Sequence, residues 1–187
     1  MNSGDTAWIL ACSALVLLMT PGLAFFYAGL GRSKNASATI MYSFMSMGIV
    51  SVVWVLWGYT LAFGPDVGGF IGGLDYLGLA GVSAFESTLG LTISDQVFMI
   101  FQAMFAIITP ALITGAFAER MKFSTYCVFI ILWVTLVYAP VAHWVWGGGR
   151  GAQIRKDKLE LYRLSMGFAG VPLHFGVERA QSPMTLR

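Results

Sequence analysis

Four long stretches without a charged side chain dominate this 187-residue sequence. Each of them is longer than the roughly 20 residues that a helix needs to cross the hydrocarbon core of a bilayer. Lipid offers no hydrogen-bond partners to a free backbone, so a crossing segment of this kind must satisfy its own polar groups, as a helix does. We predict an all-α membrane protein with four transmembrane helices, at about residues 7–30, 37–63, 96–118 and 123–146.

Composition agrees with this class. Hydrophobic residues make up 57% of the chain and charged residues 11%, whereas soluble domains carry about 25% charged residues. The first stretch follows Asn2–Asp5, which contains no base, so we interpret it as a retained span rather than a secretory signal. Cys12 and Cys127 both fall inside predicted spans and are interpreted as small buried residues, with no disulfide or metal framework.

The distribution of charge between the spans predicts an orientation. Before residue 150, every Lys and Arg lies in one of two short turns, at residues 31–35 and 119–122. The connection 64–94 carries only acids, and we expect short interfacial or re-entrant helices in it. Basic turns stay in the cytoplasm. We therefore predict a multi-pass protein of the cell membrane with its N-terminus and residues 64–94 outside.

Aromatic residues gather at the predicted outer ends of the last two spans. Phe101 and Phe105 are four residues apart, which places them on one face of a helix. Trp146 ends the fourth span, three residues after His143. Because consecutive spans are antiparallel, the Phe pair and Trp146 are expected at the same mouth. Composition alone would also explain Trp146 as an aromatic-belt anchor and His143 as an interfacial histidine.

The character of the chain changes after Gly149. Residues 150–187 hold seven of the eleven Lys and Arg residues and contain no apolar run long enough to span a membrane. We expect two regions, a transmembrane region at 1–149 and a different tail at 150–187 that is frameshifted or disordered. No second half forms the internal repeat that many transporters show.

Several stretches taken together resemble the ammonium transporter family (Amt/MEP/Rh). They are Pro21–Leu30 with Arg32–Asn35, Phe101-Gln102 with Phe105-Ala106, Gly115–Arg120, and Ala142–Gly149. The resemblance implies that the chain supplies the first four helices of an eleven-helix fold. It also implies a homotrimer with one pore per subunit, and a PII-type regulator that docks on a cytoplasmic C-terminal region absent from this chain.

The resemblance also assigns roles to the aromatic residues. It implies that Trp146 and Phe105 bind ammonium at an outer recruitment site through cation–π contacts, and that Phe101 and Phe105 line the vestibule or its gate. The family's structural Asp and pore histidines follow Gly149. Here Gly167–Gly170 echoes that motif with Gly in place of Asp, and His174 is given no role.

We therefore expect ammonium or ammonia transport, with this chain as a truncated and inactive part. The alternatives are an ammonium sensor of the same family and a membrane fragment that only associates with other subunits. No nucleophile–base pair or metal-ligand set is present in the sequence, so we expect no enzyme activity, no cofactor and no metal. Nucleic-acid binding is not expected either, because the Lys and Arg residues of the tail follow the end of the fourth span, which is predicted to lie outside the cell.

Overall fold

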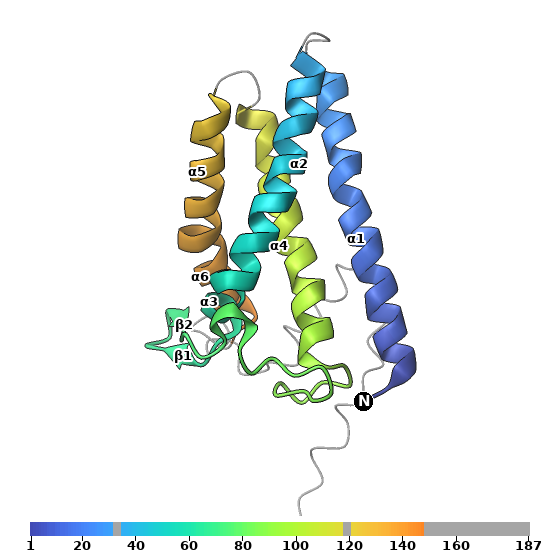
Figure 1. Cartoon of the computed structure of the whole chain (residues 1–187), viewed down its shortest axis with the longest axis vertical. Helices are drawn as coiled ribbons and strands as arrows, with labels where there is room; N and C mark the ends of the chain where they lie inside the picture. Colours follow the sequence, from blue (N-terminus) through green and yellow to red (C-terminus); the bar gives the residue numbers. More distant parts are fainter. Residues whose placement is uncertain (32–34, 118–120, 148–187) are drawn as a thin grey trace, which may run out of the picture.

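The computed structural model describes residues 1–31, 35–117 and 121–147. Within these residues the chain is mostly helical outside the connection 64–94, and four helices are long and apolar enough to cross a membrane (Figure 1). This confirms the predicted spans to within a few residues. The spans are α1 (Ser3–Leu30), α2 to α3 (Ala36–Phe63), α4 (Asp95–Phe117) and α5 to α6 (Phe123–Val145).

The four spans run alternately up and down, and α4 lies at the centre of the bundle (Figure 1). It packs against α1, α2 and the fourth span, and it is the most buried of the four. One end of the bundle carries the connection 64–94, and we call it the loop end; the other carries Lys122 and is called the turn end. As predicted, α4 begins and α6 finishes at the loop end.

Two spans are interrupted by a turn of wider, π-helical winding. In the second span, η2 (Trp54–Gly58) separates α2 (Ala36–Val53) from α3 (Tyr59–Phe63). In the fourth, η4 (Val134–Tyr138) separates α5 (Phe123–Trp133) from α6 (Ala139–Val145). Pro140, the second residue of α6, lacks the N–H that a regular turn would use, which gives a reason for the wider winding just before it.

The two π-helical turns hold the second and fourth spans together. The indole N–H of Trp57 donates to the hydroxyl of Thr135 at 2.9 Å, and that hydroxyl donates in turn to the carbonyl of Ile131 at 2.8 Å. The rings of Trp54 and Tyr138 also meet, with centroids 6.0 Å apart. Trp54 is fully buried and belongs to the core.

The connection between the second and third spans differs from the expected interfacial helices. It forms a hairpin of two short antiparallel strands, β1 (Asp66–Val67) and β2 (Ile71–Gly72), and a single 3-10 turn, η3 (Leu77–Leu79). The hydroxyl of Thr60 holds it to α3: it donates to the carbonyl of Gly73 at 2.6 Å and accepts from the N–H of Tyr76 at 3.1 Å.

At the turn end, side chains from one span bond to the backbone of another. Tyr42 donates to the carbonyl of Met121 at 2.7 Å, and Tyr27 donates to the carbonyl of Leu112 at 3.1 Å. A methyl group added at Gly115 would lie 2.8 Å from the Tyr27 ring, so the glycine lets α1 and α4 approach. Glu119, His174 and the predicted tail 150–187 lie outside the described residues.

Candidate outer binding site

The Phe101 and Phe105 rings are in contact, as their spacing on α4 predicted. Their centroids are 5.1 Å apart and their planes meet at 81°, an edge-to-face arrangement. Phe101 is almost fully buried, whereas Phe105 is only half-buried. Phe105 therefore keeps part of its ring accessible, and Phe101 holds that ring in place from the side. The edge-to-face geometry is the one that aromatic quadrupoles favour.

Trp146 lies where α6 ends. Its backbone N–H donates to the carbonyl of Ala142 at 2.8 Å, and its dihedral angles leave the helical region. The side chain is half-buried and packs against the same hydrophobic cluster as Phe105. Phe101, Phe105 and Trp146 thus all belong to or pack against the hydrophobic core that runs through the bundle. Their role toward ammonium is taken up as a proposal below.

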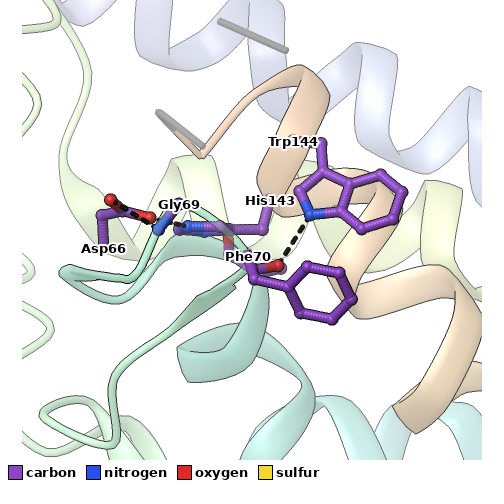
Figure 2. Close-up of polar contacts among 6 residues, drawn as sticks. Asp66, Gly69, Phe70, His143 and Trp144 are labelled. Atoms are coloured by element: carbon purple, nitrogen blue, oxygen red, sulfur yellow. Dashed lines mark hydrogen bonds and ion pairs between the residues drawn. The ribbon is translucent and has the colours of Figure 1, made fainter. Parts of the chain in front are cut away.

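His143, one turn before Trp146, is fully buried and contacts two oxygen atoms (Figure 2). Its Nδ1 lies 2.9 Å from the carbonyl oxygen of Ala62, at the end of the second span. Its Nε2 lies 2.9 Å from Oδ1 of Asp66, in β1. The other carboxylate oxygen of Asp66 accepts the N–H of Gly69 at 3.1 Å. We call these contacts the His143 clasp, since they join the ends of two spans to the hairpin.

The neighbouring side chain strengthens the same junction from the other face. The indole N–H of Trp144 donates to the carbonyl of Phe70 at 2.7 Å, and the two rings pack edge to face with centroids 5.1 Å apart (Figure 2). Trp144 and His143 therefore reach both sides of the hairpin from consecutive positions on α6. Trp144 has the pattern that an aromatic-belt residue would show, with a partly exposed ring and a polar tip bonded to backbone.

Gly147 fits against the clasp with no room for a side chain. A Cβ there would lie 2.2 Å from the carbonyl oxygen of Ala62 and 2.6 Å from Nδ1 of His143. Its own N–H donates to the carbonyl of His143 at 3.0 Å. The φ of Gly147 is not in the left-handed region, so its backbone conformation does not require glycine. Glycine is needed here because the neighbouring backbone approaches too closely for a side chain.

Charge is distributed unevenly between the two ends of the bundle. Among residues 1–31, 35–117 and 121–147, the only Lys or Arg is Lys122, at the turn end. The acids of these ranges all belong to the loop end or the N-terminal turn of α1: Asp5, Asp66, Asp75, Glu86 and Asp95. Asp95 is buried at the start of α4, where both carboxylate oxygens accept the N–H of Thr88, at 3.0 and 3.1 Å.

The pairing of His143 with Asp66 was missed at the sequence level, where His143 was considered only as an interfacial residue. The two residues are 77 positions apart, and no spacing rule connects them. A signal was nevertheless present. Asp66 is the first charged residue after the second span, and His143 lies near the end of the fourth. The predicted topology brings both to the same end of the bundle.

Comparison with known proteins identifies the family. The model of the Ammonium Transporter Family matches residues 7–169. The chain is 50% identical over 176 residues to an ammonium transporter of Bacillus subtilis, covering 92% of this chain and 43% of that protein. It is 49% identical over 149 residues to ammonium transporter Amt1 of Archaeoglobus fulgidus, covering 80% of this chain and 36% of the relative.

Solved structures show the same fold. The crystal structure of Candida albicans Mep2 matches with a TM-score of 0.75 and 34% identity, over 82% of this chain and 34% of that one. A protein described as a sensor Amt protein matches with a TM-score of 0.70 and 28% identity, over 76% of this chain and 34% of its own.

These matches show a multi-pass membrane protein. They also show how much of each relative this chain covers. The chain spans less than half the length of the curated relatives it matches. The family match continues 20 residues beyond Gly149, from 150 to 169, into the region that was expected to be a separate tail. Across its transmembrane helices and into that region, this chain belongs to the ammonium transporter family.

Proposed function

We propose that this chain is part of a protein that moves ammonium or ammonia across a cell membrane, and that its loop end receives the incoming ammonium. The observation that carries the proposal is the Phe101–Phe105 ring pair on the central helix, on the same hydrophobic cluster as Trp146. The relatives at about 50% identity are described as ammonium transporters, which supports the substrate.

In this proposal Trp146 and Phe105 bind the cation, and Phe101 and Phe105 line the vestibule or its gate. A cation over an aromatic face gains about 0.5–2 kcal/mol, depending on how far it is desolvated. Two such faces hold ammonium loosely, which suits a site that must release it onward. They do not offset full dehydration, so the ion must keep water or find hydrogen-bond acceptors here. The proposed step is therefore recruitment of a partly hydrated ion.

The proposed orientation places the loop end and the N-terminus outside the cell. The turn end then lies in the cytoplasm. The supporting observation is that Lys122, at the turn end, is the only Lys or Arg among the described residues, while four acids lie at the loop end. Assembly as a homotrimer and regulation by a PII-type protein stay predictions from the family resemblance.

We also propose that these 187 residues do not conduct on their own. In this proposal Phe101 and Phe105 supply only one wall of a path, and His143, the histidine among the described residues, is engaged with Ala62 and Asp66. Expressed in cells that lack ammonium uptake, the chain is expected to give no growth on low ammonium. Saturable uptake by the chain would overturn this part of the proposal.

Ammonium binding is tested separately, with the chain in lipid nanodiscs and its tryptophans replaced by 5-fluorotryptophan. The fluorine resonance of Trp146 is assigned by its loss in Trp146→Phe. It is expected to move as ammonium chloride replaces sodium chloride at constant ionic strength, while the resonance of lipid-exposed Trp8 stays. Phe105→Ala should weaken the response about 2- to 30-fold, the equivalent of one cation–π contact. No movement at Trp146 would refute the proposed site.

A further inference from the structure

The two contacts of His143 determine how many protons its ring carries. The partner of Nδ1 is the carbonyl oxygen of Ala62, at 2.9 Å, and a carbonyl can only accept. Nδ1 therefore bears a hydrogen. A neutral imidazole has one N–H, so its Nε2 would then present a lone pair to Asp66 Oδ1, also at 2.9 Å. Two oxygen partners at this distance require one more proton, on the ring or on the carboxyl group.

The surroundings of Asp66 favour the ring as the holder of that proton. Oδ2 of Asp66 accepts the N–H of Gly69 at 3.1 Å, and a hydrogen bond of this kind stabilises the charged carboxylate. The side chain of Asp66 is 34% exposed, so water also solvates the negative charge. The buried imidazole gains a charge-assisted hydrogen bond at each nitrogen, and its positive charge is balanced by Asp66.

The clasp in turn fixes the position of Trp146. The carbonyl of His143 accepts the N–H of Gly147 at 3.0 Å, and Gly147 packs directly onto the Nδ1–Ala62 hydrogen bond. Trp146 lies between these two residues in the chain. If the imidazole leaves Ala62 and Asp66, the surface against which residues 146 and 147 rest is lost.

We propose that His143 is a positioning residue that works as a doubly protonated imidazolium, and that Asp66 keeps the second proton on it. Together they hold the end of the fourth span, and with it Trp146, against the second span and the hairpin. The use of Trp146 for ammonium rests on the proposed function above. The protonated clasp itself does not depend on it.

Without the second ring proton, a lone pair on Nε2 would face the Asp66 carboxylate at 2.9 Å, and the clasp would open. The elements packed against α6 contribute few other ionisable groups: Tyr59 on α3, Asp66 on β1 and Tyr138 on η4, while β2 has none. Asp75 and Tyr76 follow β2 in the connection, and the base Lys122 is at the turn end.

The protonation state can be read directly by nitrogen NMR. The chain contains two histidines, so ¹⁵N-histidine labelling in a His174→Gln background reports on His143 alone. We expect both ring nitrogens of His143 to be protonated, as its two oxygen partners require. Asp66→Asn is the matched variant, because the new amide can donate to a bare Nε2 and keep both contacts with a neutral ring. In that variant one nitrogen should be protonated and the other bare. A ring with one bare nitrogen in the unmodified chain overturns the proposal.

The positioning role is read from the fluorine resonance of Trp146 without any ammonium. In the unmodified chain this resonance should be narrow. Asp66→Asn should keep a narrow Trp146 line, because its amide can still bond to Nε2, whereas Asp66→Ala should broaden the Trp146 line and leave that of Trp8 unchanged. A narrow Trp146 line in Asp66→Ala overturns the positioning role. Since no ammonium is present, failure of the proposed binding site leaves both readings unaffected.

Discussion

Replacement of Gly147 by alanine tests whether close approach of backbones fixes the loop end. The added methyl carbon would stand 2.2 Å from the carbonyl oxygen of Ala62, against 3.4 Å or more for an ordinary contact. Relief therefore needs a movement of more than 1 Å between the ends of the second and fourth spans. Such a movement stretches the 2.9 Å bond from His143 to Ala62 beyond hydrogen-bonding distance.

The size of the effect follows from these losses. Overpacking of a tight site costs about 1–3 kcal/mol, and a lost hydrogen bond to a charged group about 1.5–3 kcal/mol. The two overlap, because the movement that relieves the first causes the second. We expect Gly147→Ala to lower the free energy of unfolding by about 2–4 kcal/mol. The measurement is reversible unfolding in mixed detergent micelles, followed by circular dichroism and tryptophan fluorescence.

Gly29→Ala is the matched control. Gly29 lies in α1, and a Cβ there meets nothing within 4 Å. The change should be neutral or stabilising by up to about 1 kcal/mol, since alanine favours a helix over glycine. If Gly147→Ala is as stable as the unmodified chain, the two span ends are not held by this contact, and the reasoning about the clasp is wrong.

Three further outcomes are expected. Thr60→Val removes two hydrogen bonds to the connection at once and should cost about 1–3 kcal/mol, with faster amide exchange confined to residues 64–94; unchanged exchange there would refute its anchoring role. Cysteines placed in residues 64–94 of a cysteine-free chain should react with an impermeant reagent added outside, and a cysteine at Lys122 should not; the reverse pattern would invert the topology. Trp57→Phe and Thr135→Val should each lower the free energy of unfolding by about 1 kcal/mol, and the double variant should lose no more than either single variant. Losses that add up would show that the two residues do not stabilise the chain through their shared hydrogen bond.

The spans could be predicted from the sequence because the bilayer imposes a single strong rule. A charged side chain is costly at membrane depth, so the charge-free stretches mark the helices. The contact between Phe101 and Phe105 was equally predictable, since both residues belong to one helix with a known repeat. Local rules of this kind need no knowledge of the neighbouring spans.

Other features could not be predicted because they depend on contacts between spans. The π-helical turns have the same apolar composition as the α-helix around them. What distinguishes them is contact between spans: the bond from Trp57 to Thr135 and the meeting of the Trp54 and Tyr138 rings. The burial of Trp54 could not be read from the sequence, because an apolar face toward lipid and one toward the core look alike in a membrane protein. The hairpin was missed because its strands are two residues long, and its turn depends on Gly68 and Gly69, both with positive φ.

The clasp and the aromatic site also constrain each other electrostatically. An imidazolium without a counter-ion at the loop end would repel an arriving cation. At roughly 8 Å and an effective dielectric constant of about 20, the repulsion between two unit charges is about 2 kcal/mol. That equals the upper end of what one aromatic face provides, about 0.5–2 kcal/mol. A positively charged His143 is therefore compatible with ammonium at Trp146 only if its charge is balanced nearby. Asp66, 2.9 Å from Nε2, would supply that balance, so in the proposed site the carboxylate that holds the imidazolium in place would also let a second cation approach the same end of the bundle.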